Sequence, residues 1–185
     1  MKSHLLYVAV LLGTLCLSSC GSSKKVEKSP IKTFVMPCSE LKSGEGVIRA
    51  WASGKSDSET SARKKAQVAA SADLAATLSR TVNATTEDYT TALSEGQLSA
   101  VSKSLLNDKT KVTVNKTITN ATIVCDRWTK DEQTGQYTNY MVLEIKGNDY
   151  LKLLYEELKN NKDISIDMEL LEKLFMKNIN ESNNK

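Results

Sequence analysis

The sequence predicts an α+β fold, with an antiparallel sheet and with a long alanine-rich helix and further helices packed on one face. Three patterns support this prediction. A long alanine-rich stretch follows a short apolar segment near residue 50, a threonine- and valine-rich region contains one clear turn, and two amphipathic stretches come last. Because strands and helices do not alternate regularly, the helices are expected to cover one face of the sheet.

A strand and a long helix are expected first. Residues Val47–Ser53 are apolar or small and lie between Gly46 and Gly54, which is typical of a strand bounded by turns. Ser56 and Glu59 match a capping box, so a helix should run from about Asp57 to Asn83. Its inner face recurs every four residues: Ala62, Ala66, Ala70, Leu74, Leu78 and Val82. Small alanine side chains allow such a helix to lie close against a sheet.

The next segment, from Asn83 to Asn107, predicts a helix, an interruption and a second short helix. Tyr89 and Leu93 continue the helical spacing, and Ser94–Gly96 interrupts it. The spacing resumes at Leu98, Val101 and Leu105.

Strands are expected from Lys109, where threonine and valine become frequent. The apolar positions form two sets of opposite parity: Val112, Val114 and Ile118, and then Ala121, Ile123 and Cys125. One flat strand cannot bury both sets on one face, so we expect a bulge or break near Thr119–Asn120. The turn at Asp131–Gly135 predicts an antiparallel hairpin with a returning strand at Tyr137–Ile145.

Two amphipathic helices complete the fold. Asn148 or Asp149 is expected to cap the first, whose apolar face contains Leu151, Leu154, Tyr155 and Leu158. The second spans about Ile166 to Ile179, within a terminal segment from 161 to 185, and carries Met168, Leu171, Leu174 and Phe175. This last helix either folds back onto the sheet or presents its apolar face to another subunit.

The amino-terminal stretch predicts export and lipidation. Lys2 precedes an apolar run from Leu5 to Leu17 that is too short for a permanent membrane span, so it is typical of a secretory signal. The run ends in Leu17-Ser18-Ser19-Cys20-Gly21, which resembles the lipobox of bacterial lipoproteins. The resemblance implies that residues 1–19 are removed and that Cys20 is acylated with palmitate-like chains. An ordinary signal peptide with an incidental cysteine is the alternative.

The resemblance to a lipobox also implies a location. Glycine rather than aspartate follows Cys20, which favours the outer membrane, and residues 21–28 lack an acidic run of the kind that directs some lipoproteins to the cell surface. The expected location is therefore the outer membrane, lipid-anchored and facing the periplasm. Residues 20–44, rich in serine, lysine and glutamate, are expected to form a flexible tether to a domain at 45–160.

The remaining two cysteines predict a disulfide. Once Cys16 is removed and Cys20 is acylated, Cys38 and Cys125 are left in a compartment that permits disulfides. A bridge between them would close a loop of roughly ninety residues and stabilise the fold by roughly 4 to 5 kcal/mol. Two buried free thiols are the alternative.

The composition excludes several classes of function. The one histidine, His4, leaves with the signal, which excludes histidine-based catalysis and histidine metal sites in the mature protein. No phosphate-loop pattern or Cys-x-x-Cys pair occurs, and the near-neutral mature chain gives no argument for nucleic-acid binding. We therefore expect no enzymatic activity, cofactor or metal.

Four aromatic residues are candidates for a binding surface: Trp51, Trp128, Tyr137 and Tyr140. They lie on the first strand and on the hairpin, so they are expected near one another. Stacked on one face of the sheet, they would bind a partner or a sugar. A purely structural cross-strand cluster is the alternative.

Several segments resemble the LPP-twenty family of bacterial lipoproteins. The resemblance to the alanine-rich helix of that family is carried by Gly46–Gly54, Ala62-Arg63, Ala66 and Ala70–Ala75. The resemblance to its closing hairpin is carried by Cys125–Trp128, Gly135–Tyr137 and Met141–Leu143. It covers about residues 44 to 158 and implies a small α+β domain, related to the amino-terminal domain of a flagellar assembly protein, without enzymatic activity. Family members often carry arginine where Ser71 stands, so no salt bridge is expected from that position.

These observations lead to two hypotheses. The first is a membrane-anchored, non-enzymatic lipoprotein that acts as an interaction or envelope-structure module, with an envelope protein or a second copy of itself as partner. The second is a periplasmic module that binds a small molecule or a glycan in a pocket between the helices and the hairpin.

Overall fold

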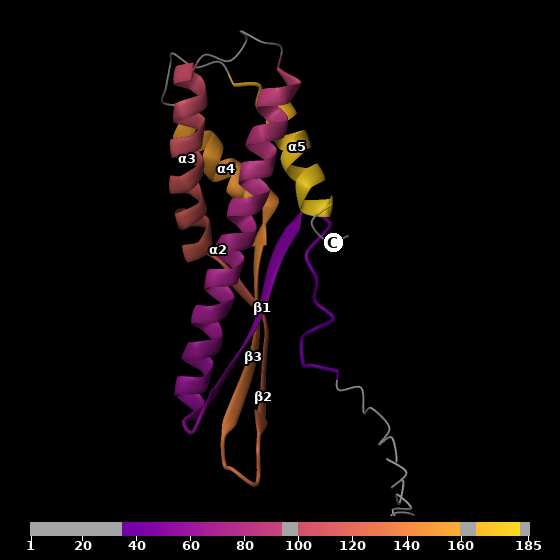
Figure 1. Ribbon diagram of the computed structural model, residues 1–185, viewed down its shortest axis with the longest axis vertical. Helices are drawn as coiled ribbons and strands as arrows, with labels where there is room; N and C mark the ends of the chain where they lie inside the picture. Colours follow the sequence, from indigo (N-terminus) through magenta and orange to yellow (C-terminus); the bar gives the residue numbers. More distant parts are fainter. Residues whose placement is uncertain (1–34, 94–99, 160–165, 182–185) are drawn as a thin grey trace, which may run out of the picture. The chain divides into compact units, whose positions relative to one another are not determined.

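A three-stranded antiparallel sheet and four helices form the described part of this computed structural model, which covers residues 35–93, 100–159 and 166–181 (Figure 1). This arrangement confirms the α+β class. The elements are β1 (Val47–Ser56), α2 (Glu59–Ala92), α3 (Ala100–Thr119), β2 (Thr122–Lys130), β3 (Tyr137–Lys146), α4 (Gly147–Leu158) and α5 (Met168–Glu181).

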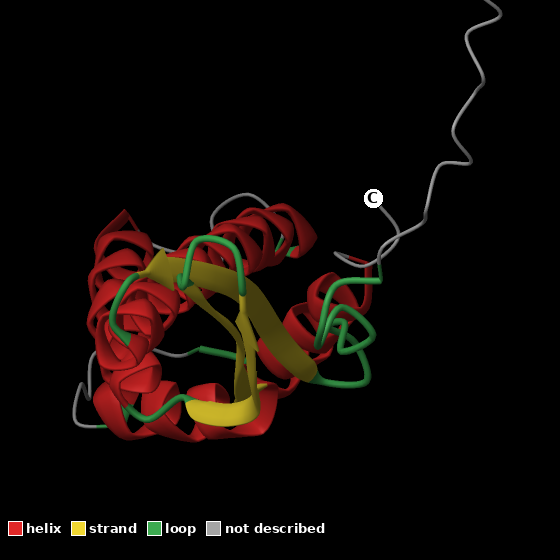
Figure 2. Ribbon diagram, turned by 90° about the horizontal axis from the view of Figure 1, so that it is seen from below, coloured by secondary structure: helices red, strands yellow, loops and turns green. Residues whose placement is uncertain are grey.

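The hairpin strand β3 is the centre of the sheet, which has the order β1-β3-β2. Figure 2 shows the strands in yellow with the helices in red beside them. Ala50 lies opposite Leu143, and Cys125 lies opposite Val142. The expected turn and returning strand are confirmed: the Gly135 N–H donates to the Asp131 carbonyl at 2.7 Å. A bulge is present, but it lies inside β2 between Ile123 and Cys125.

Helix α2 packs on one face of the sheet through the predicted stripe. Five of its residues, Ala62, Ala66, Ala70, Leu74 and Leu78, are fully buried. Ile48 and Ala50 of β1, with Met141 and Leu143 of β3, supply the opposing apolar surface. The alanines let the backbones of β1 and α2 come close together, as the spacing predicted.

The ends of α2 differ from those expected. The helix begins at Glu59 after Ser58, whose side chain makes no capping hydrogen bond, so the predicted capping box of Ser56 and Glu59 is wrong. It also continues without a break past Asn83 to Ala92, because Val82 and Tyr89 remain buried against other helices. The expected interruption at 94–96 lies outside the described residues.

The strand expected from Lys109 is wrong, since α3 extends to Thr119. Its buried residues have helical spacing: Leu106, Thr110, Thr113, Val114 and Thr117. The hydroxyls of Thr113 and Thr117 donate to the backbone carbonyls four residues earlier, at 2.8 Å in both cases, so buried threonine is satisfied within the helix. Tertiary packing thus overrides the strand preference of threonine and valine. The parity change near Thr119–Asn120 marks the end of a helix.

The carboxyl-terminal half of α2 joins α3, α4 and α5 in a helical layer beyond the sheet. Tyr150 and Phe175 stack with their ring centroids 4.8 Å apart. The Tyr89 hydroxyl accepts a hydrogen bond from the Asp167 N–H, and the Asp167 carboxylate accepts one from the Leu170 N–H in the first turn of α5. Burial raises the pKa of the Tyr150 hydroxyl, which makes no hydrogen bond to the described residues.

Two details of the terminal helices differ from expectation. Helix α4 follows β3 directly, with Lys146 before its first residue, so Asn148 and Asp149 lie inside the helix and do not cap it. Tyr155 is 51% exposed rather than part of the apolar face. Helix α5 does fold back, through Leu171, Phe175 and Ile179, but it packs mainly on α2 and α4 and reaches the sheet only near Gly46, whose N–H donates to the Asn180 side chain at 3.4 Å.

Candidate functional site

The segment from Val35 to Gly44, here called the strap, lies against the face of the sheet opposite α2. Cys38 and Cys125 form a disulfide, with an S–S distance of 2.10 Å and a Cα–Cα distance of 6.1 Å, which confirms the predicted bridge. The Trp51 indole N–H donates to the Pro37 carbonyl at 2.9 Å, and Val142 beneath is fully buried. This part of the expected tether is therefore bound to the sheet.

The end of the strap closes part of the outer edge of β1. The Ser43 hydroxyl accepts a hydrogen bond from the Arg49 N–H at 2.8 Å and donates one to the Arg49 carbonyl at 3.1 Å. The Arg49 guanidinium donates to the Lys42 carbonyl and forms an ion pair with Glu144. These hydrogen bonds attach the end of the strap to Arg49 of β1. The strap is therefore fixed to the sheet at two places, the disulfide and Arg49.

The four predicted aromatic residues do not form one patch. Trp51 and Tyr140 lie on the strap face, with ring centroids 6.2 Å apart, and Trp51 is covered by the strap. Trp128 and Tyr137 lie on the α2 face, at the hairpin end. The reason is strand parity, since Tyr137 and Tyr140 are three residues apart on one strand and must point to opposite faces. The prediction of a single four-residue surface is wrong.

Trp128 and Tyr137 do line a shallow hollow at the hairpin end. Its volume is about 400 Å³, and its other lining residues are Glu59, Thr129 and Lys130. Trp128 is 36% exposed, and the Lys130 ammonium lies 5.0 Å from the centre of the Tyr137 ring. Two of the four candidate residues therefore share an accessible surface.

A polar network fixes this end of the hairpin to α2. Arg63 of α2 donates to the Asp126 carboxylate at 2.8 Å. The other oxygen of Asp126 accepts a hydrogen bond from the buried Asn139 amide at 2.5 Å. The position of β2, and with it Trp128, is therefore set by contacts from two other elements.

A second concavity, here called the α3–α4 groove, lies where the end of α3, the start of α4 and the ends of β2 and β3 meet. Its volume is about 370 Å³. The lining is mainly polar and charged: Thr117, Asn120, Thr122, Glu144, Ile145, Lys146, Asp149, Lys152, Leu153 and Glu156. Glu144 pairs with Arg49, and Glu156 pairs with Lys159. Lys146 and Lys152 form no ion pair within the part of the chain that the structure describes.

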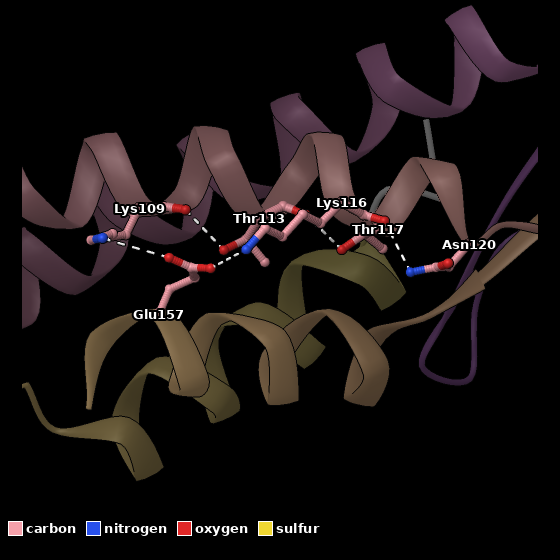
Figure 3. A network of polar contacts seen from close by, with 6 residues as sticks. All are labelled: Lys109, Thr113, Lys116, Thr117, Asn120 and Glu157. Atoms are coloured by element: carbon pink, nitrogen blue, oxygen red, sulfur yellow. Dashed lines mark hydrogen bonds and ion pairs between the residues drawn. The ribbon is translucent and has the colours of Figure 1, made fainter. Parts of the chain in front are cut away.

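Glu157 joins the two helices that form this groove (Figure 3). Its carboxylate accepts a hydrogen bond from Lys116 and lies 3.5 Å from the Lys109 ammonium. The hydrogen bond from Lys116 lowers the pKa of the Glu157 carboxyl. At the end of α3, the Asn120 amide donates to the Lys116 carbonyl at 3.2 Å. The two contacts of Glu157 hold α3 against α4.

Sequence reasoning missed the α3–α4 groove because the end of α3 was expected to be a strand. The three-residue spacing of Thr117 and Asn120, which both line the groove, is the available signal, since it places both side chains on one side of a helix. The remaining candidate, Cys20, lies outside the described residues, as do residues 21–34 of the expected tether.

Within residues 35–93, 100–159 and 166–181, no group of three or more Cys, His, Asp or Glu side chains is placed to hold a metal ion. None of the helices in these ranges is both long and apolar enough to span a membrane. Comparisons with protein-family models, curated proteins and solved structures found no match.

Proposed function

We propose that this chain is a bacterial lipoprotein, anchored through Cys20 in the outer membrane, whose folded domain acts in the periplasm as a non-enzymatic interaction or envelope-structure module. Two parts of the chain support the proposal. The stretch before Cys20 resembles a lipobox, and the domain carries a disulfide. Membership of the LPP-twenty family, as the resemblance suggests, is part of this proposal.

The bridge between Cys38 and Cys125 is the observation that carries the proposal. Disulfides persist in the periplasm and are rare in the reducing cytoplasm. The bridge also ties the strap, the first described part of the chain, to the sheet. A chain of fourteen residues, 21–34, separates Cys20 from the strap and can span at most about 50 Å. The domain of an anchored protein would therefore work close to the membrane.

The anchor is tested by replacing each of two neighbouring cysteines and fractionating the cells. We expect Cys20→Ser to lose incorporation of a labelled fatty acid and to be absent from the outer-membrane fraction. Cys16→Ser is the matched control, because it changes a cysteine four residues earlier that is removed with the signal. Retention of the Cys20→Ser protein in the outer membrane with its fatty-acid label would contradict the proposed anchor.

The α3–α4 groove favours a second function, the binding of a small molecule in the periplasm. Its volume of about 370 Å³ falls within the range of small-molecule sites. Lys146 and Lys152 offer ammonium groups, and Thr122 and Asn120 offer neutral hydrogen-bonding groups. Asp149 adds a carboxylate that forms no ion pair with the described residues, so the groove suits an amino-acid derivative or a sugar that carries both an amino group and a carboxylate.

This second function is tested by thermal unfolding in the presence of cell-wall sugar and peptide fragments. A ligand of the groove should raise the Tm of the wild-type protein and raise it much less in Lys152→Ala. Lys173→Ala, which removes an exposed lysine from α5, serves as the control. If every fragment leaves the wild-type Tm unchanged, this second function is rejected.

A further inference from the structure

The outer edge of β2 is open in the part of the chain that the structure describes. The sheet order places β2 at an edge, and β3 is the only described helix or strand that packs extensively against it. Ile123, Val124 and Trp128 are each more than one-third exposed. An open edge strand offers backbone N–H and C=O groups that can pair with another strand.

The hairpin turn shows which backbone groups face outward. The N–H and C=O of Asp131 both bond across the hairpin, to Gln136 and Gly135. Because these groups alternate in direction along an antiparallel strand, those of Asp126, Trp128 and Lys130 point away from β3. The same alternation is seen at the outer edge of β1. There the N–H and C=O of Arg49 point away from β3, and both bond to the Ser43 hydroxyl.

The two edges of the sheet are not equally open. At β1, Ser43 occupies the outward groups of Arg49, and the Lys65 ammonium donates to the Lys55 carbonyl at 3.0 Å. At β2, no described residue occupies the outward backbone groups of Asp126, Trp128 or Lys130. The edge of β2 is therefore the better site for an added strand.

The outward-facing residues of the regular part of β2 are arranged symmetrically about Trp128. The bulge between Ile123 and Cys125 ends it on one side, and the turn that begins at Asp131 ends it on the other. The outward-facing residues of this stretch are Asp126, Trp128 and Lys130, and Trp128 is the middle one. An antiparallel pair of identical strands uses this whole stretch only when the two-fold axis passes through Trp128.

We propose that two copies of this chain pair through β2, antiparallel, with Trp128 facing the partner's Trp128. The six outward-facing residues, three from each copy, would then hydrogen-bond across the interface and join the two sheets into one sheet of six strands. Helix α2 packs on β1 and β3, so it leaves the edge of β2 accessible. This proposal deepens the interaction function proposed above by naming a second copy as the partner.

The charges on β2 favour this register over its neighbours. In it, Asp126 lies opposite the partner's Lys130 on both sides of the axis, and opposite charges across strands are favourable. If the two-fold axis passed through Asp126, Arg127 or Lys130, that residue would lie opposite its own copy. Two like charges would then face each other directly. An axis through Thr129 avoids that clash but leaves Asp126 opposite the turn and so loses its hydrogen bonds.

Symmetric cross-linking of the full-length chain in intact cells tests both pairing and register. Facing residues in a hydrogen-bonded pair have Cα atoms about 5.5 Å apart, within the range of a disulfide. We expect Trp128→Cys to form a covalent dimer under mild oxidation. Glu132→Cys, on the exposed turn outside β2, is the control, because the two copies of this position would lie beyond opposite ends of the paired strands, roughly 20 Å or more apart. Equal dimer yields from the two variants, or none from Trp128→Cys, would overturn the proposal.

A second measurement retains Trp128. The mass of the detergent-solubilised full-length protein should show a dimer that becomes at least about tenfold weaker in Lys130→Glu, since Asp126 would then face a carboxylate on both sides of the axis. Lys111→Glu, an equal charge change on the exposed side of α3, should leave the dimer unchanged. A monomer at all concentrations, or an unaffected Lys130→Glu dimer, would contradict the proposal. A dimer also formed by Cys20→Ser would separate pairing from the proposed anchor.

Discussion

Gly54 determines how closely β1 approaches α2. A Cβ atom placed on this residue would lie 2.2 Å from the Ala62 carbonyl oxygen and 2.4 Å from the Ala66 nitrogen. Both contacts are with helix backbone, which cannot move aside as a flexible side chain can. The alanine stripe and this glycine together therefore make the tight contact between strand and helix.

We expect Gly54→Ala to lower the free energy of unfolding by about 3 kcal/mol, the upper part of the usual range for an overpacked core. Chemical denaturation measures the change. Gly135→Ala is the control, since its Cβ would meet no atom within 4 Å and only its positive φ of 72° is unfavourable. That control should lose about 1 kcal/mol. Equal losses in the two variants would contradict the close contact at Gly54.

Glu157 makes stability depend on pH through the contact between α3 and α4. Lys116 lowers the pKa of its carboxyl in the folded protein, below the value of about 4.3 in an unfolded chain. The stabilisation is therefore complete above the unfolded pKa and is lost as the pH falls through the folded pKa. We expect Glu157→Gln to lower the Tm by a few degrees at pH 7, with the difference shrinking below about pH 4.

The control for this prediction is Glu156→Gln. Among the residues that the structure describes, Glu156 forms its ion pair with Lys159 of the same chain segment, an exposed pair, so its loss should change the Tm little. Thermal scans of both variants between pH 3 and pH 7 make the comparison. A Glu157→Gln difference that grows as the pH falls would refute the assigned role.

At the scale of elements, substitutions in α3 distinguish a helix from a strand, because the two structures predict different exposure for its valines. Val112 and Val114 would share one face of a strand, whereas in α3 Val114 is 7% exposed and Val112 is 43% exposed. We expect Val114→Asp to destabilise the fold by several kcal/mol, because it buries an unpaired charge, and Val112→Asp to have a small effect. Denaturation midpoints test this. Strong destabilisation by both substitutions would indicate a strand.

The sequence predicted some elements well because their signals are local. The turn at Asp131–Gly135 and the alternation after Tyr137 define the hairpin, and the four-residue alanine spacing defines α2. Helix α3 was missed because its inner face is threonine, whose hydroxyls bond within the helix only when packing already holds it there. Strand propensity alone does not include that packing.

The disulfide joins the strap to β2 across most of the fold. Loss of the bridge in Cys38→Ser combined with Cys125→Ser should lower the free energy of unfolding by roughly 4 to 5 kcal/mol, because a loop of 87 residues is no longer closed in the unfolded chain. Denaturation with and without a reducing agent measures this. Reduction should destabilise the wild type and leave the double variant unchanged. A reductant effect of equal size in both proteins would show that the bridge is not the cause.

At the scale of the whole molecule, the candidate sites were only partly predictable. Spacing along strands can place Trp128 and Tyr137 on one face, but the covering of Trp51 by the strap depends on a contact between residues 14 apart in sequence. The α3–α4 groove is formed where four elements meet, so no single stretch of the sequence predicts it. By contrast, Cys38 and Cys125 could be paired by elimination, since the other two cysteines have separate expected fates.

The account depends above all on the proposed anchor, and the mass of the mature protein tests it most directly. Protein purified from the membranes of its native cells should begin at Cys20 and exceed the mass of residues 20–185, with the disulfide counted, by that of a diacylglyceryl group and an amide-linked fatty acid. Tandem mass spectrometry would place both on Cys20. A mature chain that begins elsewhere, or that begins at an unmodified Cys20, would contradict the lipoprotein assignment.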